Sequence, residues 1–201
     1  MTRVKVCGLK RPEDMAYANE LLPGFVGFVF AKASKRYVPP EFAVALREQL
    51  SPQIVSVGVF VDEPVEQVVS LLESGVIGMA QLHGAESQAY VRELKSRTHA
   101  PIIQAFRIAS RDDVLHVEES EADYILLDHG AGGTGESFDW SLLDGVDRPF
   151  FLAGGLSAGN VGEAIARYKP FAVDSSFKLE TDGVKDYNKM KAFVEAVRQN
   201  C

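Results

Sequence analysis

Several side chains that could carry chemistry stand at, or just after, the ends of stretches that are predicted to be buried strands. Among them are a thiol, an imidazole, carboxylates, an arginine, a pair of glycines and a pair of serines. A thiol and a carboxylate can exchange protons with a substrate, an arginine fork binds a carboxylate, and glycine backbone can approach a phosphate. The set therefore indicates acid–base chemistry on a small anion. Its members are Cys7, Arg36, His83, Asp128, Gly154, Gly155, Asp174, Ser175 and Ser176.

Taken singly, each of these residues also has an ordinary structural explanation. A lone cysteine such as Cys7 is usually a small buried hydrophobe, and the glycine pair 154–155 could serve a tight turn that needs a positive φ. Asp128 could cap a turn, Arg36 could be a solvated surface charge, and His83 is better explained as a supporting residue than as a catalytic base. What favours a function is their shared position at strand ends, where open-topped α/β folds build active sites.

Strands and helices are predicted to alternate along the whole chain. The predicted strands are rich in β-branched and aromatic residues and cover 4–9, 25–30, 54–60, 79–84, 101–106, 123–128, 150–155 and 171–176. Apolar residues at helical spacing predict helices over about 12–22, 40–50, 64–74, 87–94, 110–119, 157–168 and 185–199. Eight such units with short connections predict an α/β fold, a closed (β/α)8 TIM barrel. An open doubly wound sheet is the alternative.

The stretch after the seventh predicted strand points to a phosphate site. Gly154 and Gly155 precede Ser157, which is predicted to cap the following helix. Backbone N–H groups and a helix N-terminus both favour an anion, and this fold often binds phosphate after its last two strands. A second glycine-rich stretch, residues 132–135, could form another anion-binding loop or a lid.

Length and composition narrow the class of protein. The 201 residues suffice for one compact barrel, so we expect a single domain over 1–201. A net charge of −7, with no basic run among aromatics, argues against a nucleic-acid partner. No apolar run reaches the roughly 18 residues that cross a membrane. We therefore expect the binding partner to be a small-molecule substrate, and neither a nucleic acid nor a membrane. We expect the protein itself to be a monomer or a homodimer.

Two cysteines stand at opposite ends of the chain, and this spacing suits neither a disulfide framework nor a metal site. The histidines likewise show no zinc-type spacing. The first predicted strand begins so close to Met1 that no signal peptide fits before it. We expect a reduced, cytoplasmic protein without a metal, in which the terminal Cys201 is inert.

Six short segments occur in a characteristic order: 5–9 (KVCGL), 34–38 (SKRYV), 81–84 (QLHG), 127–128 (LD), 133–140 (GTG and FDW) and 152–156 (LAGGL). Residues 180–186 (ETDGVKD) extend the pattern toward the last helix. Together they resemble the phosphoribosylanthranilate isomerase family of tryptophan biosynthesis. The resemblance implies an Amadori rearrangement, without metal or cofactor, of N-(5-phosphoribosyl)anthranilate to 1-(2-carboxyphenylamino)-1-deoxyribulose 5-phosphate. It further implies that Asp128 is the general acid for the ribose ring oxygen and that Cys7 is the base that removes the proton from C2 of the sugar.

The same resemblance implies how the substrate is held. Arg36 would bind the anthranilate carboxylate, and Asp174 would lie near the sugar or the amino group. His83 would support the site beside Cys7. The phosphate would lie against the backbone of the two strand-end pairs, Gly154 and Gly155 together with Ser175 and Ser176.

One segment departs from the family pattern, because Phe177 stands where a second serine is usual, and Lys178 follows it. This change affects the side chains around the phosphate, where Lys178 could supply charge. Two alternatives remain open from the residues: another phosphosugar barrel such as an epimerase, and a phosphosugar-binding barrel without activity. For catalysis, we expect the site to lower the pKa of Cys7 and to raise that of Asp128, since an ordinary thiol is mostly protonated and an ordinary carboxyl mostly ionised at neutral pH.

Overall fold

Eight parallel strands close into a barrel in which they follow one another in chain order, as the computed structural model shows for residues 1–128 and 140–200. The first strand pairs with both the second and the eighth, so the predicted (β/α)8 barrel is confirmed and the open sheet is excluded. The strands are β1 (Arg3–Cys7), β2 (Phe25–Val29), β3 (Val55–Phe60), β4 (Met79–Leu82), β5 (Ile102–Arg107), β6 (Tyr124–Asp128), β7 (Phe150–Leu152) and β8 (Ala172–Ser175).

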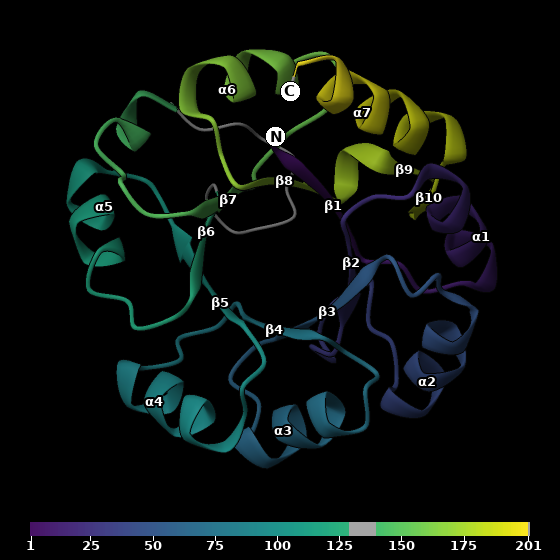
Figure 1. Cartoon of the computed structure of the whole chain (residues 1–201), viewed down its shortest axis with the longest axis horizontal. Coiled ribbons are helices and arrows are strands. Elements are labelled where there is room, and N and C mark those ends of the chain that lie inside the picture. The colour runs from purple at the N-terminus through teal and green to yellow at the C-terminus, as the bar shows by residue number, and fades with distance from the viewer. Residues whose placement is uncertain (129–139, 201) are drawn as a thin grey trace.

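Helices form a ring around these strands, as Figure 1 shows in a view down the barrel. They are α1 (Pro12–Leu21), α2 (Pro40–Gln49), α3 (Val65–Glu73), α4 (Gln88–Arg97), α5 (Arg111–Val117), α6 (Val161–Tyr168) and α7 (Tyr187–Gln199), with short 3-10 helices η1 (Trp140–Leu143) and η2 (Phe177–Leu179). Ser87 caps α4 and Ser110 caps α5, each by accepting a hydrogen bond from a backbone N–H in the first turn. In the parts of the chain that the structure describes, every helix is too short or too polar to cross a membrane.

Two predictions about where helices begin in the C-terminal half of the chain were wrong. Ser157 does not cap α6, because the backbone N–H of Ser157 donates to Asn160 Oδ1, and this turn delays the helix until Asn160 takes the N-cap position. The last helix does not begin at Lys185, because that residue lies in a two-stranded hairpin of β9 (Glu180–Thr181) and β10 (Val184–Lys185). Asp186 caps α7 instead, and accepts a hydrogen bond from the N–H of Lys189.

The apolar core has two layers, because successive strand residues point to opposite faces of the sheet. Outward residues such as Val6, Phe28 and Leu127 pack against the helices, and inward residues fill the barrel. Full burial of one such side chain stabilises the fold by about 1.5–3 kcal/mol. The inner layer consists of Phe25, Val57, Met79, Ile103, Leu126, Phe151, Ala153 and Ala172. These apolar side chains fill the interior of the barrel at the amino-terminal side of the strands, and the polar side chains lie at the carboxyl ends of the strands.

Candidate active site

A cavity of about 950 Å³ opens at the carboxyl ends of the strands. This volume suits a substrate of the size of a small cofactor or drug. Every site residue predicted from the sequence lines this cavity, although the segments that carry them are far apart in the chain. These residues are Cys7, Arg36, His83, Asp128, Gly154, Gly155, Asp174, Ser175 and Ser176.

Cys7 is the last residue of β1, and its thiol is free and buried. The facing residue on β2 is Gly27, and a Cβ at that position would lie 2.7 Å from Cys7 Sγ, so the glycine makes room for the thiol. Burial raises the pKa of Cys7, while the charges of Lys5 and Lys185 act in the opposite direction. The expectation that the site lowers this pKa is therefore wrong, because desolvation and the negative charge of Asp174 together outweigh the two cations.

Lys5 and Asp174 form a buried ion pair directly below Cys7. Lys5 lies two residues before Cys7 on β1, so both side chains point into the barrel. It is fully buried, and its Nζ lies 2.9 Å from Asp174 Oδ2 on the neighbouring strand β8. The other carboxylate oxygen, Asp174 Oδ1, is buried and has no hydrogen-bond partner within the described parts of the chain. It can accept a hydrogen bond from a ligand in the cavity.

Asp128 and His83 meet on another wall of the cavity. Asp128 ends β6 and is mostly buried, and its Oδ2 lies 3.6 Å from His83 Nε2. The opposite ring atom, His83 Nδ1, lies 2.8 Å from the side-chain nitrogen of Gln81 on β4. His83 thus lies beside Asp128, whereas the sequence reasoning placed it beside Cys7. The expected rise in the pKa of Asp128 stays a prediction.

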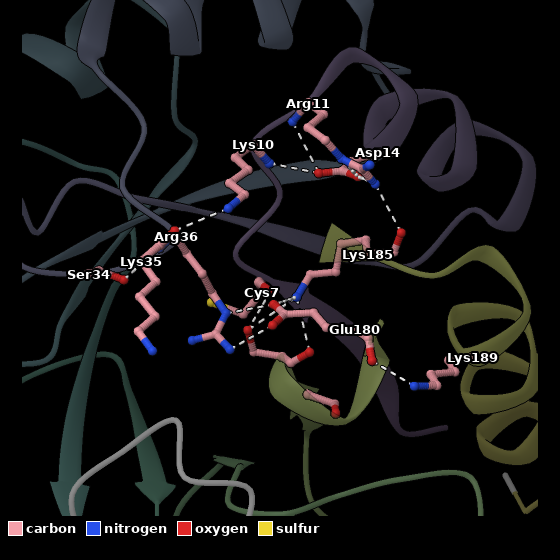
Figure 2. A network of polar contacts seen from close by, with 12 residues as sticks. Cys7, Lys10, Arg11, Asp14, Ser34, Lys35, Arg36, Glu180, Lys185 and Lys189 are labelled. Carbon is pink, nitrogen blue, oxygen red and sulfur yellow. Dashed lines mark hydrogen bonds and ion pairs between the residues drawn. The ribbon is translucent and has the colours of Figure 1, made fainter. Parts of the chain in front are cut away.

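Arg36 extends from the loop after β2 and is held by the hairpin that follows β8. Its Nε and Nη2 donate to the two carboxylate oxygens of Glu180 over 2.6 and 2.9 Å. Lys185 donates to the same carboxylate over 2.7 Å. Figure 2 shows these three side chains gathered beside Cys7. The default interpretation of Arg36 as a solvated surface charge is therefore wrong.

The predicted phosphate end is formed by the segments after β7 and β8. Gly154 and Gly155 have φ values of 85° and 66°, a region that favours glycine, so the residue type is required here. The hydroxyl groups of Ser175 and Ser176 donate to the backbone oxygens of Leu156 and Cys7. These hydroxyl protons are therefore committed to the protein, and the N-terminus of α6 is set back from the glycines by the turn at 157–160.

Part of the predicted site lies outside the described residues. The glycine-rich stretch 132–135, expected to be an anion-binding loop or a lid, falls in 129–139; Cys201, expected to be inert, also lies outside the described residues. Within the described ranges, no three His, Cys, Asp or Glu side chains are arranged to hold a metal ion.

Sequence reasoning missed three charged residues at the site, Lys5, Glu180 and Lys185. Lys5 stands two residues before Cys7, and the alternation of a strand could have placed it on the same inner face. Glu180 and Lys185 belong to the segment that matched the family pattern, but their positions depend on a hairpin that no clear strand signal predicts. All three side chains are mostly buried, with Lys5 at 0% and Lys185 at 1% side-chain exposure.

Comparison with known proteins identifies the family to which this chain is similar. The sequence model of N-(5'-phosphoribosyl)anthranilate (PRA) isomerase matches residues 4–196. A curated N-(5'-phosphoribosyl)anthranilate isomerase from Caldanaerobacter subterraneus subsp. tengcongensis is 45% identical and is covered, like this chain, over 98% of its length. The crystal structure of phosphoribosyl anthranilate isomerase from Thermotoga maritima superimposes with a TM-score of 0.89 at 34% identity, over 99% of this chain and 100% of that one.

A further solved structure is a phosphoribosyl anthranilate isomerase in complex with reduced 1-(o-carboxyphenylamino)-1-deoxyribulose 5-phosphate. It is 34% identical, has a TM-score of 0.86, and covers 99% of this chain and 100% of that chain. The match of the family model over nearly the whole length, with relatives at this identity and coverage, leaves one assignment. The chain belongs to the N-(5'-phosphoribosyl)anthranilate isomerase family.

Proposed function

We propose that Cys7 and Asp128 exchange the protons in the isomerase step of tryptophan biosynthesis that this family performs. The step converts an aminoaldose into an aminoketose, so it needs a donor for the ring oxygen and an acceptor for the proton on C2. The observation that carries the assignment is that both side chains line one cavity, at the ends of strands β1 and β6. Asp128 would protonate the ring oxygen, and Cys7 would then take the C2 proton from the open-chain Schiff base.

Two cations would assist Cys7 as the base. Burial raises the pKa of the thiol and opposes its ionisation, whereas Lys5 and Lys185 favour the thiolate. Lys5 is itself held by Asp174 at 2.9 Å, so its ammonium cannot swing away from the thiol. These contacts support a thiolate that forms when substrate binds, because the positive charges of Lys5 and Lys185 would balance its negative charge.

His83 would act as a supporting residue for the acid. Its Nε2 lies 3.6 Å from Asp128 Oδ2, and Gln81 holds the other ring nitrogen. An imidazole N–H in this place can orient the carboxyl group toward the substrate. This role agrees with the sequence-based view of His83 as a residue that does not itself take the substrate proton.

The substrate would span the cavity from Arg36 to the glycine pair. Arg36 would bind the anthranilate carboxylate, and the backbone at Gly154, Gly155 and Ser176 would bind the phosphate. Because the serine hydroxyl protons are already donated to the backbone, Lys178 would add the positive charge on this side. Asp174 Oδ1, which is buried without a partner in the described chain, suits an N–H or O–H of the substrate between these two ends.

A fluorescence assay tests the assignment. Phosphoribosylanthranilate is generated in situ from anthranilate and phosphoribosyl pyrophosphate, and its consumption is followed with wild type, Cys7→Ala and Asp128→Asn. Loss of general acid–base catalysis is expected to cost about 10²–10⁴-fold in rate. Near-normal turnover in a folded Cys7→Ala protein would discard Cys7 as the base while keeping the reaction, and the same result for Asp128→Asn would discard the acid.

We further propose one catalytic domain over residues 1–201 that works in the cytoplasm as a monomer or homodimer. The free, buried thiol of Cys7 suits a reducing compartment. The net charge of −7 supports a small-molecule substrate rather than a nucleic acid. Sedimentation equilibrium of the full chain distinguishes one copy from two.

A further inference from the structure

A small hairpin outside the barrel brings two charged side chains to Arg36. Strands β9 and β10 follow β8 and pair with each other, and each contributes one residue to the contact, Glu180 and Lys185. Figure 2 shows Glu180 pointing toward the guanidinium of Arg36 and Lys185 pointing toward the carboxylate of Glu180, next to Cys7. Glu180 has no role in the proton transfers assigned above, and Lys185 acts there only through its charge, which favours the Cys7 thiolate.

The contacts leave Glu180 little freedom. Its carboxylate accepts from Arg36 Nε at 2.6 Å and Nη2 at 2.9 Å, and from Lys185 Nζ at 2.7 Å. Lys185 also donates to the backbone oxygen of Ser176 at 3.0 Å and contacts its hydroxyl at 3.2 Å. Side-chain exposure is 7% for Glu180 and 1% for Lys185. The carboxylate is therefore fixed on both sides.

We propose that Glu180 is a positioning residue for the substrate's carboxylate: it holds the guanidinium of Arg36 so that the remaining edge faces the cavity, while Lys185 holds Glu180. This inference rests on the proposed function, in which Arg36 binds that carboxylate. A guanidinium has five N–H groups, and Glu180 uses the one on Nε and one on Nη2. The edge formed by Nη1 and Nη2 remains for a second carboxylate, in the bidentate geometry that arginine favours.

The charge balance of the cluster supports the same conclusion. Burial lowers the pKa of Lys185, but its ion pair with Glu180 at 2.7 Å favours the charged form. With Lys185 protonated, Arg36 and Lys185 carry two positive charges and Glu180 one negative charge, so the cluster has a net charge of +1 that one substrate carboxylate neutralises. Burial by itself would raise the pKa of Glu180, but the hydrogen bonds from Arg36 and the charge of Lys185 hold this pKa below its usual value. Glu180 is thus ionised at neutral pH and keeps the two cations together.

The same contacts could instead make Glu180 a competitor that the substrate must displace from Arg36. The anchoring by Lys185 argues against displacement, because the same oxygen, Glu180 Oε1, accepts from Lys185 Nζ and Arg36 Nε, so Lys185 holds it where Arg36 donates. The two hypotheses predict opposite effects on substrate affinity. A positioning residue lowers KM, so its loss raises KM. A competitor raises KM, so its loss lowers KM.

Two substrates separate positioning from a general structural role. One is N-(5-phosphoribosyl)anthranilate, and the other is N-(5-phosphoribosyl)aniline, which lacks the carboxylate. For Glu180→Gln we expect kcat/KM to fall about ten- to hundred-fold with the first substrate, mainly through KM, and to change little with the second. Arg36→Gln should give the same selective loss. Asp123→Asn, which removes a lysine-paired carboxylate at the other end of β6, should leave both substrates unaffected.

Three results would overturn the proposal or its basis. A lower KM for the anthranilate substrate in Glu180→Gln would make Glu180 a competitor, and an equal loss with both substrates would make it a merely structural residue. If Arg36→Gln showed no dependence on the carboxylate, the carboxylate site of the proposed function would fail instead. Should Glu180→Gln not fold, Glu180→Asp takes its place: it keeps the charge beside Lys185 but shortens the side chain that reaches Arg36, and the same selective loss is expected of it.

Discussion

Replacing Lys5 with methionine should both destabilise the barrel and weaken the base. Lys5 is fully buried and its ammonium lies 2.9 Å from Asp174 Oδ2. Burial alone would lower the pKa of Lys5, but Asp174 and Cys7 together outweigh this effect, so the pKa lies above its ordinary value. Because the pKa is raised, the contribution of the ion pair is fully present at neutral pH and is lost only as pH rises above the ordinary value of 10.5. The variant therefore loses a pair that is intact under assay conditions.

The cost in stability follows from the charge that remains. Removing one partner of a buried ion pair leaves an uncompensated charge and costs about 3–5 kcal/mol. For a chain of this size, about 2–4 °C of Tm is lost per kcal/mol, so Lys5→Met should lower Tm by about 6–20 °C. The double variant Lys5→Met, Asp174→Asn removes both charges and should recover most of that loss. Thermal unfolding followed by circular dichroism compares wild type, Lys5→Met, Asp174→Asn and the double variant at one pH.

The kinetic effect should follow a different order from the effect on stability. Lys5 lowers the pKa of Cys7 more strongly than Asp174 raises it. The alkaline rise of kcat/KM, which reports the base of the free enzyme, should therefore lie at lowest pH in Asp174→Asn, then in wild type, then in the double variant, and at highest pH in Lys5→Met. Four identical pH profiles would refute the coupling between Lys5 and Cys7. Recovery of Tm without recovery of the profile would confirm that the two effects are separate.

Three further changes test the site. Gly27→Ala would place a Cβ 2.7 Å from Cys7 Sγ, so the thiol must move and kcat should fall. The free energy of unfolding should fall by about 1–3 kcal/mol, which is measured as a lower Tm. An unchanged kcat would show that the position of the thiol is not critical. Gly8→Ala, at φ +80°, would place a Cβ 2.4 Å from Arg36 Cδ, so steady-state kinetics should show a raised KM with the anthranilate substrate only. Because the pKa of Glu180 is lowered, its contribution to stability is present above the ordinary pKa and is lost as pH falls through the lowered one. Tm of wild type should thus fall more steeply below about pH 4.3 than Tm of Glu180→Gln.

Local sequence signals were sufficient for the barrel. A β-branched run such as 25–30 and an amphipathic pattern such as 64–74 each specify their own element, and both were found close to the predicted positions. The position of a strand end also follows from such a pattern, so the sequence alone places Cys7 and Asp128 at the same end of the barrel. These predictions depend on periodicity alone, which is a property of neighbouring residues.

Predictions failed where the structure depends on a competing neighbouring side chain or on burial in the fold, because residue type and periodicity express neither. Ser157 has the right residue type for a helix cap, but the side chain of Asn160 accepts a hydrogen bond from the N–H of Ser157, and Asn160 itself takes the N-cap position. The pKa of Cys7 was expected to fall because an ordinary thiol is mostly protonated at neutral pH and a base must be able to ionise. The buried position between β2 and β8 imposes a desolvation penalty that a linear sequence does not express.

Arg36 shows most clearly why a site residue can be identified without its mechanism. The residue type and loop position suggested a fork for a carboxylate, yet in the fold the fork already holds Glu180, which lies 144 residues further along the chain. An arginine whose side chain is 18% exposed would sample many rotamers without that contact, and each would have to be lost when substrate binds. A protein carboxylate bound to one edge removes that cost in advance and leaves the other edge oriented. The hairpin β9–β10 thus acts on affinity by preorganising Arg36, which is why the selective loss with the anthranilate substrate, rather than the overall activity, is the decisive measurement.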